Sequence, residues 1–252
     1  MKKVANVFIL LFIAITLSAQ SAYNFTVVKA NPITSIKNQS STSTCWSFSG
    51  VAFLESELLR MDKGEFDLSE MYIVRKNWED IAKKHVRPHG HLNFAPGGSF
   101  ADVVETIDDF GIIPEEAYKG LNYGSETHNH GELDKVLAGY IEGVLGNKNL
   151  SPVWFDGFSG ILDTYLGEVP ETFTYEGKDY TPHTFAEYLE LNQNDYISLT
   201  SFTHEPFYTA FPLAIPDNWR WADSYNLPID EFITVIDNAI NNGYTVAWAS
   251  DV

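Results

Sequence analysis

The pattern of apolar and polar positions predicts a succession of helices from position 45 onwards. Apolar side chains recur three and four positions apart, at Val51, Leu54, Leu58 and Met61, which is typical of an amphipathic helix. A loop of small polar residues precedes this helix, and Gly64 supplies a stop just after it. The first predicted helix therefore begins close to position 45 and ends near position 63.

Further helices and a few strands follow along the chain. Ser69 caps a second predicted helix that runs to about Lys84. Apolar periodicity predicts other helices at 101–110, 131–143, 181–190 and 227–240, and one within the aromatic-rich span 147–169. Alternation predicts a hairpin at 172–180 with its turn at Glu176-Gly177, a strand at 196–201, and a buried strand at 244–249.

The first 22 residues have the pattern of a secretory signal. Lys2 and Lys3 precede an apolar run at 7–17, and small residues follow at 18–22. The run is shorter than the roughly 20 apolar residues that a membrane-spanning helix needs. We therefore expect a signal peptide at 1–22, a mature domain at 23–252, and a periplasmic or secreted location in a bacterium.

The chain is strongly acidic, with a formal net charge of −18. Removal of the signal takes away two lysines and no acids, which leaves 14 basic residues against 34 acidic ones. Such a chain repels phosphate backbones and anionic lipids. We therefore expect no nucleic-acid partner and no membrane association after the signal is removed.

Cys45 is the only cysteine in the sequence, so no internal disulfide can form. At the first turn of a helix, unpaired backbone N–H groups favour the thiolate, which is the form of cysteine that attacks carbonyls. Gln39 lies six residues upstream and would fold back over the loop. Its amide and the backbone N–H of Cys45 would then form a two-donor oxyanion hole. A structural cysteine beside a core Trp46 is the alternative.

Gln39, the six-residue step to Cys45 and the following Trp46-Ser47-Phe48 resemble the nucleophile motif of papain-type cysteine peptidases. Leu68-Ser69-Glu70 before an apolar helix extends the resemblance. Secreted papain-like enzymes usually carry an extra cysteine in the loop before the nucleophile. This loop has none, which is the habit of the bleomycin-hydrolase or aminopeptidase C branch.

Gly97-Gly98, the helix that follows and the run Phe110-Gly-Ile-Ile-Pro-Glu-Glu-Ala-Tyr118 resemble the same branch. The resemblance implies an α+β, papain-like fold with a complete helical lobe and an incomplete β-rich lobe. It implies that Cys45 is the nucleophile, that Gln39 helps to bind the oxyanion, and that Gly97, Gly98 and Trp46 bind the substrate. An ordinary Gly-Gly turn is the alternative for the glycine pair.

No convincing base for the thiol is present. His183 lies 138 residues after Cys45, within the range of papain-like chains, but it follows a Thr-Pro helix opening and precedes no Asn-Ser-Trp-Gly element. His204 and the Asn218-Trp219 pair are weaker alternatives. We therefore predict that the catalytic His and Asn lie beyond Val252 and that the chain is C-terminally truncated.

Two His-x-His pairs raise the question of a metal site. His89 and His91 form one pair and His128 and His130 the other, but both lie in loops without an HExxH helix or a cysteine partner. We therefore predict no metal and no cofactor.

The sequence as a whole supports the hypothesis of an exported cysteine peptidase that hydrolyses peptide bonds, most like an aminopeptidase. The alternative is a truncated, inactive relative that binds peptides without cleaving them. A homo-oligomer is compatible with the habit of the family.

Overall fold

A computed structural model of the protein describes residues 25–250. The chain divides into one unit that ends at Ala30 and a second unit that starts at Asn31, and the account below concerns the second unit. The predicted signal peptide lies outside the described residues. Within 25–250, no helix is both long enough and apolar enough to cross a membrane.

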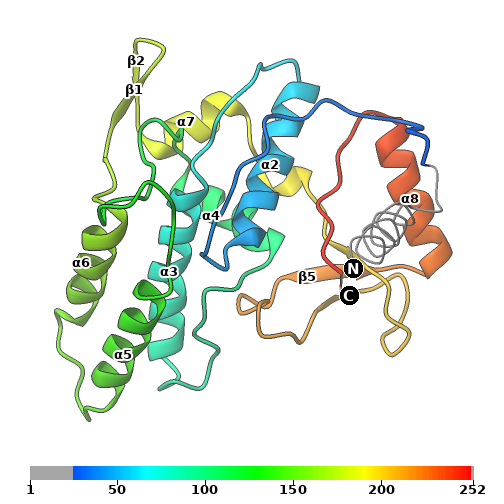
Figure 1. Cartoon of the computed structure of the whole chain (residues 1–252). Coiled ribbons are helices and arrows are strands. Elements are labelled where there is room, and N and C mark those ends of the chain that lie inside the picture. The colour runs from blue at the N-terminus through cyan, green and yellow to red at the C-terminus, as the bar shows by residue number, and fades with distance from the viewer. Residues whose placement is uncertain (1–24, 251–252) are drawn as a thin grey trace, which may run out of the picture. The chain divides into compact units, whose positions relative to one another are not determined.

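Helices make up most of the regular secondary structure of the second unit, and α3 is at their centre (Figure 1). It packs against α2, α4, α5 and α6. The helices of the described residues are α2 (Cys45–Arg60), α3 (Glu70–Val86), α4 (Phe100–Phe110), α5 (Leu133–Leu145), α6 (Trp154–Leu166), α7 (Pro182–Leu189) and α8 (Ile229–Asn241), with a short 3-10 turn η1 (Gln193–Asp195). Each predicted helix is present, although α5 and α8 begin two residues later than expected.

The strands are few and short. β1 (Phe173–Tyr175) and β2 (Lys178–Tyr180) form an antiparallel hairpin. Glu176 and Gly177 at its turn have positive φ angles of 49° and 79°, as a two-residue turn of the favoured hand requires. A second sheet has β5 (Asp223–Asn226) at its centre, parallel to β3 (Leu199–Thr200) and antiparallel to β4 (Ala210–Pro212).

The prediction of a buried strand at 244–249 is wrong. Residues 244–250 have no regular secondary structure, and Trp248 is 53% exposed. An extended segment becomes a strand only when a neighbour completes its hydrogen-bond ladder, and no described segment pairs with this one. The predicted strand at 196–201 is likewise reduced to the two residues of β3, which are the ones that pair with β5.

Capping residues explain where the helices begin and end. The hydroxyl of Ser69 accepts a hydrogen bond from the backbone N–H of Tyr72 at 3.1 Å, as predicted for a cap. Thr181 caps α7 in the same way, through the N–H of Thr184 at 3.2 Å. Gly111 ends α4 with a φ of 78°, a conformation that favours glycine. These local signals fix the starts of α3 and α7 and the end of α4.

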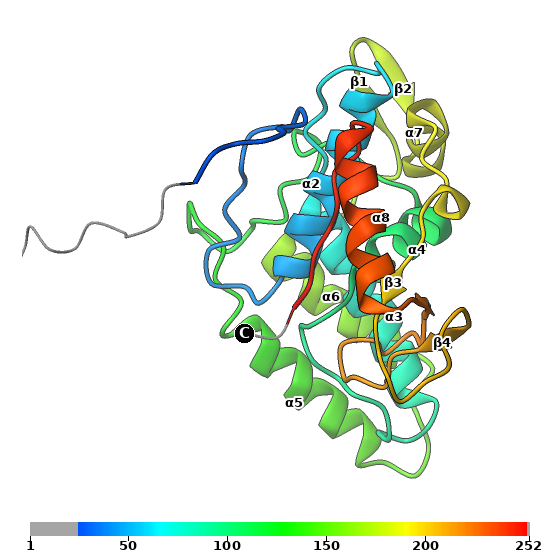
Figure 2. The same cartoon turned by 90° about the vertical axis from the view of Figure 1, so that its right-hand side faces the viewer.

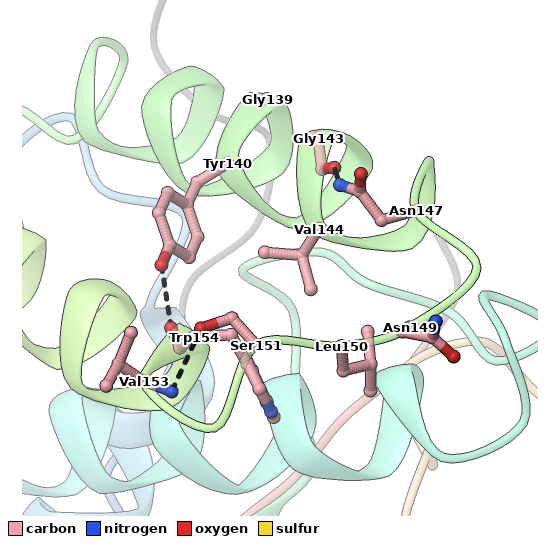
Figure 3. A pocket seen from close by; sticks show the side chains of 10 residues that line it. All are labelled: Gly139, Tyr140, Gly143, Val144, Asn147, Asn149, Leu150, Ser151, Val153 and Trp154. Carbon is pink, nitrogen blue, oxygen red and sulfur yellow. Dashed lines mark hydrogen bonds between the residues drawn. The ribbon is translucent and has the colours of Figure 1, made fainter.

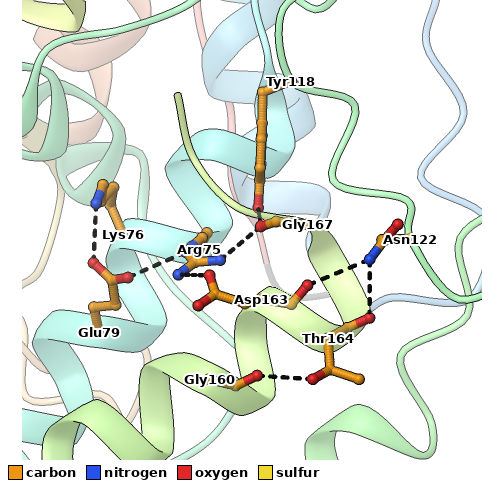
Figure 4. A network of polar contacts seen from close by, with 9 residues as sticks. All are labelled: Arg75, Lys76, Glu79, Tyr118, Asn122, Gly160, Asp163, Thr164 and Gly167. Carbon is orange, nitrogen blue, oxygen red and sulfur yellow. Dashed lines mark hydrogen bonds and ion pairs between the residues drawn. The ribbon is translucent and has the colours of Figure 1, made fainter. Parts of the chain in front are cut away.

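Arg75 ties α3 to the end of α6 (Figure 4). Its buried guanidinium forms ion pairs with Glu79 at 3.1 Å and Asp163 at 2.6 Å. It also donates a hydrogen bond at 2.8 Å to the carbonyl oxygen of Gly167, which follows α6. A cation at the carboxyl end of a helix is favoured by the helix dipole. This network holds α3, the helix that supports α2 and α4, in a fixed position.

Acidic side chains gather at the start of α3, near Lys37. Lys37 forms an ion pair with Asp67 at 2.6 Å, and Glu55 and Glu115 also lie close to it. Glu70 is buried and one of its carboxyl oxygens has no hydrogen-bond partner among the described residues. Burial and then the neighbouring carboxylates raise the pKa of Glu70 to about 8.

We predict that Glu70→Gln stabilises the fold at neutral pH. The folded-state pKa of Glu70 lies above its unfolded value of 4.5. The unfolded chain therefore loses this proton first, and the free energy of unfolding falls as pH rises from about 4.5 to about 8. Urea unfolding across this pH range should show that the free energy of unfolding falls less steeply with pH for Glu70→Gln than for the wild type. The exposed Glu65→Gln is the matched control, and equal slopes for both variants would contradict the prediction.

Candidate functional site

The loop at 38–44 leads into α2 and places Cys45 at its first position. Ser40 and Ser43 have φ angles of 55° and 56°, a left-handed conformation that residues other than glycine seldom adopt. The side chain of Asn38 supports the turn by accepting a hydrogen bond from the N–H of Ser40 at 2.9 Å. Cys45 is exposed and unpaired. Its thiol therefore stands at the amino end of a helix and is open to solvent.

The side chain of Gln39 folds back over this loop. Its Oε1 accepts a hydrogen bond from the backbone N–H of Thr44 at 2.9 Å. The backbone N–H of Thr44 needs an acceptor, so the side-chain atom that it contacts is the amide oxygen of Gln39. The amide nitrogen, Nε2, is then the atom that does not face Thr44. No described residue accepts a hydrogen bond from Nε2. The two N–H bonds of Gln39 thus remain available beside the start of α2.

A neighbouring segment anchors the loop from behind. The N–H of Ser41 donates to the carbonyl of His128 at 3.2 Å, and the N–H of His130 donates to the carbonyl of Ser41 at 2.9 Å. The ring of His130 is buried, and burial lowers its pKa to about 4. Its backbone, not its imidazole, thus makes the contact with the loop.

The described residues contain no group of three or more His, Cys, Asp or Glu side chains that could hold a metal ion. The His128 and His130 rings lie 6.1 Å apart, centroid to centroid. We therefore assign this pair to the anchoring of the loop.

Trp46 links α2, the helix that begins at Cys45, to the glycine loop, residues 96–99. Its indole N–H donates a hydrogen bond to the carbonyl of Pro96 at 3.0 Å. A Cβ on Gly98 would lie 2.8 and 2.9 Å from two ring carbons of the indole, too close for any side chain. The structure therefore brings together Cys45, Trp46 and the glycine pair, which the sequence separates by about 50 residues.

The glycine loop is held on its other side by α4. The backbone N–H and the hydroxyl of Ser99 both hydrogen bond to the carboxylate of Asp102, at 2.6 and 3.1 Å. Asp102 is fully buried and forms an ion pair with Arg220 at 3.0 Å. Burial raises the pKa of Asp102 to about 6, even though Ser99 and Arg220 favour its charged form.

Arg220 belongs to the β4–β5 loop, residues 213–222, and fastens this loop to α3 and α4. It also pairs with Asp80 at 2.7 Å, and its guanidinium stacks on Trp219. Sequence reasoning did not identify Asp102 or Arg220. The Ser99-x-x-Asp102 spacing is a capping signal that would have revealed Asp102, whereas Arg220 meets partners more than 100 residues away and has no local signal.

The structure does not bring His183 to Cys45. His183 is exposed at the start of α7, where its backbone nitrogen would lie 2.5 Å from a Cβ on Gly111. Gly111 follows α4, whose opposite end, near Ser99, faces the glycine loop. The 11 residues of α4 separate these ends by about 16 Å.

The two weaker alternatives occupy other positions. His204 lies between β3 and β4, with its ring near those of Phe202 and Phe211. Asn218 is buried, and its amide hydrogen bonds to Leu213 and Ala222 of its own loop. Its role in the described structure is therefore to shape the loop.

A pocket of about 620 Å³ lies away from these residues, between α5 and the segment that leads into α6 (Figure 3). Tyr140, Val144, Leu150 and Trp154 line it, and the hydroxyl of Tyr140 donates to the carbonyl of Trp154 at 2.8 Å. None of the predicted site residues contributes to this pocket.

The segment that contains Gln39, Cys45 and the glycine pair is similar to proteins of a known family. Residues 21–137, slightly less than half of the chain, match the family model described as papain family cysteine protease. Peptidase 1 of Psoroptes ovis is 34% identical over 86 residues, which cover 34% of this chain and 23% of that protein. The matched segment thus carries the sequence pattern of papain-family cysteine peptidases.

A solved structure extends the likeness over most of the chain. The crystal structure of PepW from Lactobacillus rhamnosis HN001 (DR20), a selenomethionine derivative, superposes with a TM-score of 0.65 at 19% identity. The alignment covers 87% of this chain and 59% of that one, so the chain spans less than two thirds of either relative. The expected α+β, papain-like fold is confirmed, with a helical lobe and few strands.

We predict that Gly98→Ala disturbs the site by pushing on the indole of Trp46. The added Cβ forces the ring or the loop to shift, which should cost about 1–3 kcal/mol of stability. Gly160→Ala in α6 is the control, since its Cβ would meet no atom within 4 Å and should stabilise the helix by about 0.5–1 kcal/mol. Urea unfolding measures both, and a neutral Gly98→Ala would refute the close contact.

Proposed function

We propose that this chain is the nucleophile-bearing part of a papain-type cysteine peptidase, in which Cys45 attacks the scissile carbonyl of a peptide. The observation that carries the proposal is the exposed thiol at the first position of α2, with Gln39 folded over the same loop. A thiol placed there benefits from the unpaired N–H groups of the helix start. The match of residues 21–137 to the family supports the same assignment.

In the proposed reaction, the sulfur of Cys45 forms a bond to the carbonyl carbon and the carbonyl oxygen takes the negative charge. Nε2 of Gln39 and the backbone N–H of Cys45 donate hydrogen bonds to this oxygen. Collapse of the intermediate expels the amine, which takes up a proton, and leaves an acyl-enzyme that water hydrolyses. The proposed proton donor is a histidine, although no histidine within residues 25–250 hydrogen bonds to Cys45.

The peptide would lie along the glycine loop. The absence of a side chain at Gly98 lets the loop pack directly on Trp46, and a substrate backbone would add along this loop as a further strand. Asp102 and Arg220 support this arrangement from behind, because they hold Ser99 at the start of α4. The loop is thus preorganised for an extended ligand.

The finer assignments rest on the sequence. The loop without a second cysteine and the glycine-loop motif support an aminopeptidase of the bleomycin-hydrolase branch. The pattern at 1–22 supports export to the periplasm or beyond. The likeness to PepW, at 19% identity, supports the fold alone.

A second candidate is a protein that binds peptides without cleaving them. Within residues 25–250 no histidine hydrogen bonds to Cys45, and His183 stands at the far end of α4. This candidate keeps the glycine loop but assigns no reaction to the thiol.

Two reactions of the thiol separate these candidates. Iodoacetamide alkylates a thiolate without forming an oxyanion, whereas an activated ester acylates it through one. We expect Gln39→Ala to slow acylation of Cys45 by at least about tenfold and to leave alkylation unchanged. The released alcohol of the ester and mass spectrometry of the labelled protein measure the two rates.

Asn38→Ala is the matched control, since it also removes one hydrogen bond of the loop but no donor to the oxyanion. Cys45→Ser should abolish alkylation. If Gln39→Ala acylates as fast as the wild type, the oxyanion role is wrong. If Cys45 reacts no faster than free cysteine in both reactions, the peptide-binding candidate is favoured.

A further inference from the structure

The carboxylate of Asp217 lies directly against the glycine loop. A Cβ on Gly97 would overlap the Oδ1 atom of Asp217, and it would lie 2.8 Å from the carboxyl carbon. Gly97 adjoins Gly98, which packs on Trp46 next to the thiol-bearing residue. The acidic group therefore stands beside the stretch of backbone along which the proposed function places a peptide.

The loop that carries Asp217 is rigid. The side-chain amide of Asn218 donates hydrogen bonds to the carbonyls of Leu213 and Ala222, each at 3.0 Å, and its oxygen accepts one from the N–H of Ala222. Asn93, just before the glycine loop, donates to the carbonyl of Pro216 at 3.2 Å. A carboxylate held this way binds a ligand with little loss of conformational entropy.

Asp217 is also available to a ligand. It is exposed, and it forms no ion pair within residues 25–250. The one cation of its loop, Arg220, is buried and turned toward Asp80 and Asp102. The site thus presents an unpaired negative charge beside the glycine pair, in a chain whose overall charge of −18 adds to the attraction for cations.

We propose that Asp217 binds a cationic group of the peptide that lies along Gly97 and Gly98, and so selects for cationic substrates. This inference depends on the proposed function, since it needs a peptide in that position. The cation is the α-ammonium group of the peptide or the side chain of a lysine or arginine. An acidic peptide is disfavoured at the same place, because like charges repel.

Equilibrium binding tests the inference without turnover. The Cys45→Ala protein is titrated calorimetrically with short peptides that differ in one charge. One pair carries lysine or the neutral norleucine at the same position, and the other pair has a free or an acetylated amino terminus. Each pair is titrated into the Cys45→Ala protein and into the same protein with the added substitution Asp217→Asn. This substitution keeps the shape of the side chain and removes its charge.

We expect Asp217→Asn to weaken binding of the cationic member by about three- to fivefold and to leave the neutral member unchanged. If Asp217→Asn abolishes the preference for lysine over norleucine, the cation that Asp217 binds is the lysine side chain. If it abolishes the preference for a free over an acetylated amino terminus, the cation is the α-ammonium group. Asp223→Asn, at the start of β5, removes the same charge from an exposed site without contact to the glycine loop and should change neither preference. High salt should reduce the preference for the cationic peptide in the protein that retains Asp217.

Two results would overturn the inference in distinguishable ways. If peptides bind but Asp217→Asn and Asp223→Asn behave alike, Asp217 has no role in selection and the proposed peptide groove stands. If no peptide binds to the Cys45→Ala protein, the inference and the groove fall together. The acylation and alkylation of Cys45 then test the nucleophile separately.

Discussion

The indole of Trp46 packs on Gly98 and holds the carbonyl of Pro96, and this contact fixes the distance between the thiol and the glycine loop. Trp46 immediately follows Cys45 in α2, so this contact ties the start of the helix to the glycine loop. The glycine loop in turn is fixed by Ser99 and Asp102 at the start of α4. One aromatic ring thus couples two helix amino ends, which is why Gly98 cannot be replaced by a larger residue without a shift.

The region around the site is stabilised by few cations among many carboxylates. Arg220 and Arg75 are each buried and each serve more than one acid, so that α3, α4 and α6 keep their positions. Where no such cation is present, as for Glu70, burial keeps the carboxyl protonated at neutral pH. The strong acidity of the chain is therefore not only a surface property, because it also determines which contacts support the functional loop.

Local signals in the sequence predicted the helices and the position of Cys45 at the start of α2. Ser69, Thr181 and Gly111 act through neighbours a few residues away, and the folding of Gln39 over its loop likewise depends on nearby backbone. The partners of Arg220, Asp217 and Asn218 lie far away in the sequence or depend on a loop conformation that periodicity cannot reveal. The segment at 244–249 was misjudged because apolar alternation describes a strand but not the presence of a neighbour that pairs with it.

The β4–β5 loop also has a consequence for the order in which the protein is made. Synthesis proceeds from the amino terminus at about 5–20 residues per second, and domains tend to fold in that order. Cys45 and the glycine loop therefore emerge long before residues 213–222, which reach them only after roughly 6–25 s more of synthesis. During that interval Asp102 is without Arg220 and Gly97 is uncovered. The ion pairs of Arg220 with Asp80 and Asp102 are thus among the last contacts of the site to become possible as the chain is made.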